Sequence, residues 1–497
     1  MNPTASSSRW PRSDCGRRTF VAGAAGSVVG IVLTGCTTAR AGHPLGTRPT
    51  PAAANPNILV LRPWYNFPNG TSSTAISLLN HGLEPFVSAH KGVRVRITTL
   101  AYQQATVAAL LAGTGPDVFE DWVLPPYVRN NLLLDLSPFV TRDNVDLGVF
   151  APAQIAYFQQ IGSFSPSGRG LYALPAYIHT KAQAVNLDIL DRLDLSYPEP
   201  GWTWRQWTQL WQAVTVKSST PNRSRTGASL PWYGFDSTGG NPAPFYWHGF
   251  GGGFVDPHSA TRCYLDSPGS VALAEWLFPL LRQGVVGGGN FATGSLVCDA
   301  LGSAGSLPAA VSGWHGIKWQ IFGQPVFPVV PDVNFAASDF YGISAGTKNP
   351  DLAWELLKYL TYGTSWQKYM MRLALTGPNQ PSLWSEWADT VRAVAPPLKS
   401  KNIEIMVHSV ARNHLYVRRL FRYANVDMAP VINRYTRLAQ TGAMGIVQAF
   451  SAAAQQVNQM QLAGASLDAQ ARRTLLTGQA QRQKALARLP ELFRQAH

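Results

Sequence analysis

Three adjacent residues, Glu120, Asp121 and Trp122, combine two carboxylates with an indole ring. Carboxylates accept hydrogen bonds from hydroxyl groups, and an aromatic face packs against the apolar face of a sugar or another flat ligand. Two acids can also catalyse glycoside hydrolysis, but only when they lie about 5–5.5 Å or 6.5–9.5 Å apart across the scissile bond. Side chains of sequence neighbours diverge in an extended chain. The trio therefore favours binding over catalysis.

The segments around these residues alternate between strand and helix patterns. Strands are predicted at 58–61, 93–97 and 117–119, and helices at 72–87, 102–111, 351–362 and through 401–462. This order predicts an α/β architecture with a largely parallel sheet. Ligands bind beyond the carboxyl ends of the strands in such sheets. The candidate ligand residues are therefore those that follow predicted strands: Trp64, Tyr65, Glu120, Asp121, Trp122, Tyr177 and His179.

Further candidates come from a loop-like stretch, 241–253, in which aromatic residues precede a glycine run. Glycine lets a backbone approach a ligand closely, so Trp247 and Gly251 are predicted to contact ligand. A glycine turn that only reverses the chain is the alternative. Tyr341 is a further candidate for ligand contact. The tryptophans of 204–211 recur at helical spacing, so they are expected in the core, with Thr203 as the N-cap of their helix.

The N-terminus has the parts of an export signal. Arg17 and Arg18 precede an apolar run, and no charged side chain occurs between Thr19 and Ala39. The run ends in Leu-Thr-Gly-Cys at 33–36, which resembles a bacterial lipobox with Cys36 as the lipidated residue. The twin arginine suggests export by the Tat route. We expect a signal peptide at 1–35 and a flexible tether at 36–56; a transmembrane anchor is the alternative.

Composition limits the other classes of function. The 497 residues carry a net charge of +14, but the basic residues are scattered, so a nucleic-acid partner is not predicted. No G-x-S-x-G, H-E-x-x-H or P-loop motif is present, and no Cys or His spacing suggests a metal, so neither a metal nor another cofactor is expected. Cys263 and Cys298 could form a disulfide or remain buried thiols.

Short motifs recur in a fixed order along the chain, at Ala112–Val118, Gly170–Pro175, Asn186, Gly201–Trp204, Gly251–Gly253, Phe340–Ile343, Lys348–Pro350 and Ala353–Trp354. Together and in this order they resemble the family 1 extracellular solute-binding proteins of bacterial ABC sugar importers. The resemblance covers about residues 57–465. Val185 stands where the family has Tyr before Asn186, and the aromatic residue that the family often places near 301–306 is missing.

This resemblance implies a two-lobe type II periplasmic-binding-protein fold, with a cleft between the lobes and hinge crossings near 175–177, 339–342 and 384–387. It implies a lobe of 57–175 plus 342–385, a second lobe of 178–338 plus 386–465, and a basic helical tail at 466–497.

The implied function is capture of a carbohydrate, without catalysis, for the permease subunits of an ABC transporter. The protein would be exported and held as a lipoprotein on the outer face of the cytoplasmic membrane. A polyamine or an anionic glycan as ligand, and an exported glycoside hydrolase, remain as alternatives.

Overall fold

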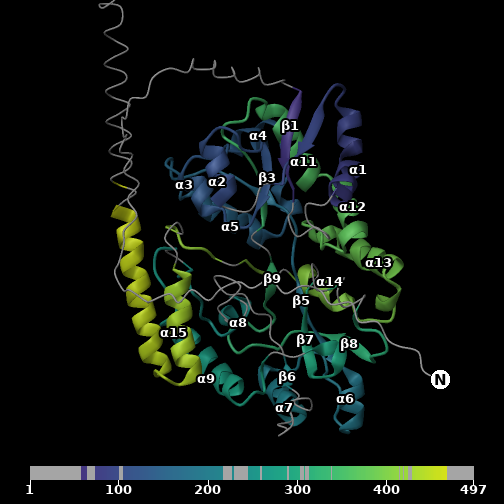
Figure 1. Cartoon of the computed structure of the whole chain (residues 1–497), viewed down its shortest axis with the longest axis vertical. Coiled ribbons are helices and arrows are strands. Elements are labelled where there is room, and N and C mark those ends of the chain that lie inside the picture. The colour runs from purple at the N-terminus through teal and green to yellow at the C-terminus, as the bar shows by residue number, and fades with distance from the viewer. Residues whose placement is uncertain are drawn as a thin grey trace, which may run out of the picture. The chain divides into compact units, whose positions relative to one another are not determined.

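The computed structural model describes residues 57–63, 73–99, 104–215, 226–228, 244–257, 260–287, 290–302, 307, 313–336, 339–412, 415–417, 419–423, 428–466 and 469. The chain divides into two units, Met1–Ala53 and Ala54–His497, and all described residues belong to the second (Figure 1). The predicted signal peptide, tether and lipidation site at Cys36, the candidates Trp64 and Tyr65, and nearly all of the predicted tail lie outside the described residues.

The first sheet has the strand order β2-β1-β3-β10-β4. β1 (Ile58–Arg62) lies parallel to β2 (Arg94–Ile97) and β3 (Val118–Asp121), as the sequence predicts. β10 (Phe340–Ile343) enters from far along the chain and pairs antiparallel with β3 and with β4 (Leu174–Pro175). The central strand β3 is fully buried, which explains its continuous apolar start.

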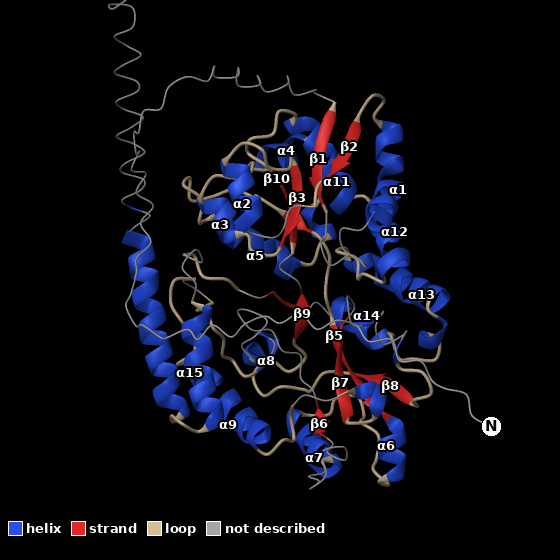
Figure 2. Cartoon of the chain, viewed as in Figure 1, coloured by secondary structure: helices blue, strands red, loops and turns tan. Residues whose placement is uncertain are grey.

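Helices on both sides of this sheet complete what we call the first lobe (Figure 2). The helices predicted at 72–87, 102–111 and 351–362 are confirmed as α1, α2 and α11. The lobe contains α1 (Ser73–Ala89), α2 (Gln104–Leu111), α3 (Pro125–Arg129), α4 (Ser137–Arg142), η1 (Leu147–Val149), α5 (Pro152–Gly162), α11 (Pro350–Thr361) and α12 (Thr364–Ala374).

The second sheet, in the order β6-β7-β5-β8, forms the centre of what we call the second lobe. β5 (Lys181–Asn186) lies antiparallel to β7 (Leu296–Gly302) and β8 (Trp319–Phe322), whereas β6 (Thr226–Ala228) is parallel to β7. The expectation of a largely parallel sheet is wrong here, because strand–helix alternation was visible only in the first 120 residues of the sequence. The predicted residue boundaries of the two lobes stay predictions.

Two helices of the second lobe, α7 and α8, can be compared with the predictions from the sequence. Thr203 caps α7 in a capping box with Gln206, as predicted. The stretch predicted as a loop at 241–253 contains α8, because Pro244 suits a first helical turn and the following aromatic residues are buried. The helices are α6 (Leu187–Arg192), α7 (Trp204–Val214), α8 (Pro244–Gly249), α9 (Pro268–Arg282), η3 (Phe291–Thr293), α15 (Ala429–Thr441) and a last helix over 446–466.

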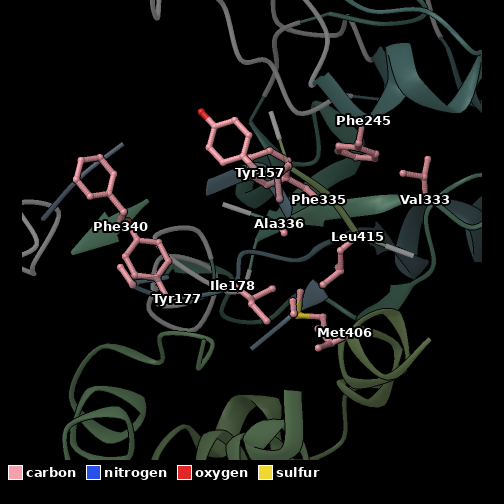
Figure 3. Packing of buried hydrophobic residues seen from close by; sticks show 14 of the residues in the cluster. Tyr157, Tyr177, Ile178, Phe245, Val333, Phe335, Ala336, Phe340, Met406 and Leu415 are labelled. Carbon is pink, nitrogen blue, oxygen red and sulfur yellow. The ribbon is translucent and has the colours of Figure 1, made fainter. Parts of the chain in front are cut away.

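Between the two larger sheets lies a two-stranded one, in which β9 (Asn334–Ala336) is parallel to β11 (Leu415–Val417). The sequence predicts helix throughout 401–462, so β11 is a departure: its three residues pair with a strand 81 positions earlier. Figure 3 shows Phe335, Ala336 and Leu415 among the buried side chains of this region. The remaining elements are η4 (Pro381–Leu383), α13 (Trp384–Val394), η5 (Pro396–Leu398) and α14 (Glu404–Ala411).

The structure also bears on the pairing of two cysteines and on membrane-spanning helices. Cys263 and Cys298 are both buried and both free thiols, so the question of a disulfide is answered in favour of thiols. Burial raises the pKa of Cys263 to about 12, which makes its thiol unreactive. Among the residues that the structure describes, no helix has the length and apolar character needed to cross a bilayer.

Candidate functional site

Three strand ends meet at one edge of the first sheet. The last residue of β3, Asp121, pairs with Phe340 at the start of β10, and Phe340 pairs with Pro175 at the end of β4. Just beyond this edge, the backbone N–H of Ala176 donates to the carbonyl oxygen of Asp339 at 3.1 Å. The chain passes between the lobes directly after β4 and directly before β10. This edge therefore collects residues from three separate parts of the sequence at the boundary of the lobes.

Asp121 organises the turn that follows β3. One carboxylate oxygen accepts the backbone N–H groups of Trp122 at 2.7 Å and Val123 at 3.4 Å, and the other accepts the hydroxyl of Tyr127 at 2.5 Å. The side chain is fully buried, and this burial raises the pKa of Asp121, although Tyr127 and Arg62 act in the opposite direction. The carboxylate therefore fixes the backbone that carries Trp122, and a direct hydrogen bond from ligand to Asp121 stays a prediction.

Glu120 and Tyr341 face each other across the β3–β10 ladder and are also buried. The guanidinium of Arg62 donates to the carbonyl oxygen of Glu120. β3 extends two residues further than the sequence predicts, so both acids belong to the strand and not to an exposed loop. Neither Glu120 nor Tyr341 is presented to solvent in this structure, and contact of either residue with ligand stays a prediction.

Tyr177 and His179 lie on the crossing from β4 to β5. Figure 3 draws Tyr177 close to Phe340, at the edge described above. The carbonyl oxygen of Tyr177 accepts a hydrogen bond from Gln154 Nε2 at 3.0 Å, and its ring is 5% exposed. The rings of Tyr177 and His179 are nearly perpendicular, at 86°, with centroids 4.5 Å apart. This packing fixes the direction of the half-buried imidazole.

His179 is the predicted site residue whose environment is most unusual. Burial, with a smaller contribution from the charge of Lys181, lowers the pKa of His179 to about 3. The imidazole is thus neutral at pH 7. Its Nδ1 atom is enclosed and makes no hydrogen bond to any residue in the described part of the chain. A neutral imidazole with such an atom can exchange a hydrogen bond with a ligand hydroxyl.

The depressed pKa of His179 predicts acid sensitivity. Between pH 6.5 and pH 3 the unfolded chain binds a proton at this residue and the folded chain does not, so stability is lost as the pH falls through this window. The loss approaches about 1.4 kcal/mol per pH unit for one such group. Urea unfolding at pH 7 and pH 5 should show a smaller loss for His179→Gln than for the parent. His408→Gln, at an exposed position, should behave as the parent; equal losses in all three proteins would contradict the assignment.

Trp247 and Gly251 both have close packing contacts in the second lobe, and their contact with ligand stays a prediction. Trp247 is fully buried on α8, with its ring centroid 4.9 Å from that of Phe254 and 5.9 Å from that of Phe450. Gly251 has a φ of +76°, and a Cβ atom added there would lie 3.2 Å from Val329 Cγ1. The alternative reading of the glycine run, a turn that reverses the chain after α8, is the one that agrees with the structure.

A buried polar cluster on the second lobe carries no signal in the sequence. Gln183 Nε2 of β5 donates to the hydroxyl of Tyr246 at 3.2 Å and to Gln324 Oε1 at 3.1 Å. Gln183 is two residues from Lys181, so both side chains leave the same face of β5 near the crossing. Only the folded register brings together amides that lie 141 positions apart in the chain.

Two surface hollows of the described chain lie elsewhere. One, of about 530 Å³, is on the outer face of α1, and the other, of about 500 Å³, is beside α14. Neither contains a predicted site residue. Trp122 and His179 are therefore the predicted residues that are both described and partly exposed at the sheet edge.

The two sheets and the crossings between them have the fold of a type II periplasmic binding protein, as expected from the sequence. The chain belongs to the bacterial extracellular solute-binding protein family, whose model matches residues 71–361. This family and its structural relatives are binding proteins. No curated protein sequence matches the chain.

Solved structures agree on the fold at low sequence identity. An ABC substrate-binding protein from Listeria monocytogenes in complex with cycloalternan has a TM-score of 0.62 and 15% identity, over 81% of this chain and 98% of that one. The cyclic alpha-maltosyl-1,6-maltose binding protein from Arthrobacter globiformis has a TM-score of 0.63 and 13% identity, over 81% and 98%. UgpB from Mycobacterium tuberculosis, in complex with glycerophosphocholine, has a TM-score of 0.61 and 16% identity, over 82% and 99%.

Proposed function

We propose that this protein captures a carbohydrate outside the cytoplasm and delivers it to the permease of an ABC importer. The observation that carries the proposal is the shared edge of β3, β10 and β4, where the half-buried Trp122 and His179 lie next to the crossings between the lobes. An indole face and a neutral imidazole match the apolar face and the hydroxyl groups of a sugar ring. One of the similar structures above is of a protein in complex with cycloalternan, and another is of a protein named for binding cyclic alpha-maltosyl-1,6-maltose.

The burial of the two acids, Glu120 and Asp121, disfavours a polyamine ligand. A cationic ligand needs exposed carboxylates, whereas Glu120 and Asp121 are buried, and Asp121 is bonded to its own turn and to Tyr127. The same burial argues against a hydrolase that uses this pair, because catalytic acids must reach the glycosidic bond. An anionic glycan remains the second candidate, supported by the net charge of +14.

A titration of the mature protein tests this proposal. Tryptophan fluorescence should change saturably with neutral oligosaccharides, and not with spermidine or putrescine. A response to uronic acids alone would favour the anionic glycan. A response to polyamines alone, or release of a shorter sugar during the titration, would overturn carbohydrate capture.

We also propose that Cys36 carries the lipid that holds the protein at the membrane. The sequence Leu-Thr-Gly-Cys at 33–36 supports this assignment. Replacement of Cys36 by serine removes the thiol that would be alkylated, so the Cys36→Ser protein is expected in the soluble fraction. Cys15→Ser, earlier in the leader, is the matched control and should leave the protein in the detergent phase. Detergent-phase partitioning of the Cys36→Ser protein equal to the parent's would contradict the assignment.

A further inference from the structure

We propose that β11 (Leu415–Val417) and residues 419–423 form a latch that holds the two lobes together without ligand and so sets how readily the binding site opens. The latch consists of β11 and the segment 419–423 that follows it. The proposal rests on the proposed function only in that ligand is expected to enter as the lobes separate. The latch itself is argued from contacts within the chain alone.

Arg419 joins the two lobes through one guanidinium group. Its Nη1 atom donates to the carbonyl oxygen of Pro257, in the segment after α8 of the second lobe, at 2.7 Å. The same atom donates to Gln160 Oε1, on α5 of the first lobe, at 3.1 Å. The donor can keep both acceptors only while α5 stays beside the second lobe, so separation of the lobes breaks at least one of the two bonds.

Arg422 repeats this arrangement three residues later. Its backbone N–H donates to the carbonyl oxygen of Ala260 in the second lobe at 2.9 Å. Its guanidinium carbon lies 5.3 Å from the ring centroid of Phe164, which follows α5 in the first lobe. This geometry is a cation–π contact between the lobes.

In a third contact, the arginine belongs to the first lobe and the aromatic ring belongs to the latch. Arg129, on α3 of the first lobe, lies over the ring of Tyr423, with 5.0 Å between the guanidinium carbon and the ring centroid. Tyr423 is held from the other side, because its backbone N–H donates to Gln461 Oε1 of the last helix at 3.3 Å. Arg129 is only 8% exposed, and a cation–π contact gains strength when it is removed from water.

The latch also connects to the binding site through a strand. β11 pairs in register with β9, and three residues after β9 the chain enters β10 at the edge that carries Trp122. Figure 3 shows Leu415 of β11, Phe335 of β9 and Tyr157 of α5 among the same group of buried side chains. The latch is thus anchored on one of the segments that cross between the lobes. Contacts that exist only when the lobes are together shift the equilibrium toward that state.

The test measures the distance between the lobes in ligand-free protein. Donor and acceptor dyes are placed at Lys91→Cys in the first lobe and Arg192→Cys in the second, both exposed positions, in a background that carries Cys15→Ser and Cys36→Ser. The native Cys263 and Cys298 are buried and do not compete for the dyes. Single-molecule energy transfer then reports the populations with the lobes together and apart.

Arg419→Gln combined with Arg422→Gln is expected to raise the ratio of open to closed molecules by about 10-fold, the effect of losing two contacts of ordinary cation–π or hydrogen-bond strength. Gln160→Leu, which removes an acceptor from the first lobe alone, should cause a smaller increase and keeps the test decisive if the double variant folds poorly. Arg412→Gln is the matched control, since the ion pair of Arg412, to Asp332 at 3.9 Å, does not reach α5.

Unchanged distance populations in Gln160→Leu and in the double variant would overturn the latch, and so would an equal change in Arg412→Gln. These outcomes do not depend on any ligand. If the parent binds no sugar but the latch variants open, the proposed function fails and the latch stands. If the parent binds sugar and the variants do not open, only the latch fails.

Discussion

Trp247→Ala is expected to destabilise the second lobe by about 3–5 kcal/mol, the usual cost of removing a large buried aromatic side chain. The indole is fully buried on α8 and packs against Phe254 and Phe450. Phe450 belongs to the last helix, so the cavity would loosen the contact between that helix and α8. Urea unfolding followed by circular dichroism measures the effect as a lower midpoint.

Trp247→Phe, which keeps an aromatic ring, should restore most of the lost stability. Trp202→Ala, at a half-buried position of the same lobe, is the matched control and should cost less. The sequence alone predicts a different result, in which Trp247→Ala weakens ligand binding by about 10-fold or more and does not lower the melting temperature greatly. That result would indicate that Trp247 contacts ligand.

Trp122→Ala is expected to weaken carbohydrate binding by 10-fold or more, because one stacked aromatic anchor commonly carries a large share of the binding energy. Trp122 is only partly buried, so the change should leave the unfolding midpoint near that of the parent. Asp121→Ala should weaken binding as well, but through the turn. It removes the acceptor for the backbone N–H groups of Trp122 and Val123 and for the Tyr127 hydroxyl, and it should therefore lower stability too.

Both variants are thus expected to lose affinity, but only Asp121→Ala is expected to lose stability as well. Calorimetric titration and urea unfolding on the same preparations separate loss of contact from loss of structure. Tyr127→Phe is the control for Asp121→Ala, since it removes one bond to the carboxylate and keeps the two backbone bonds. If Asp121→Ala loses affinity with an unchanged unfolding midpoint, Asp121 contacts ligand directly, as the sequence pattern first suggests.

The local rules of the sequence were sufficient for single elements. The apolar run at 58–61, the helical spacing of α1 and α11, and the capping box of Thr203 and Gln206 all depend on residues close together in the chain. They are confirmed because tertiary contacts reinforce these preferences. The two-lobe fold was predicted from the order of several short motifs and not from any one of them.

The site was harder to predict because its character depends on contacts distant in sequence. β10 begins at position 340 and pairs with β3. This pairing buries Glu120 and Asp121, which the sequence places in an exposed loop. β11 forms only because β9 lies beside it, inside a stretch with helical spacing. Trp247 has the residue type of a ligand contact, and only the packing of α8 against the last helix shows that it belongs to the core.

Calorimetric titration of the mature protein and its Trp122→Ala variant with neutral oligosaccharides tests the central claim most directly, which is carbohydrate capture at the shared edge of β3, β10 and β4. The account predicts saturable binding of at least one oligosaccharide by the parent, affinity at least 10-fold weaker for Trp122→Ala, and recovery of the sugar unchanged after the experiment. Equal affinity of parent and variant would contradict the location of the site. Absence of binding to every carbohydrate, together with saturable binding of a polyamine, would contradict the function.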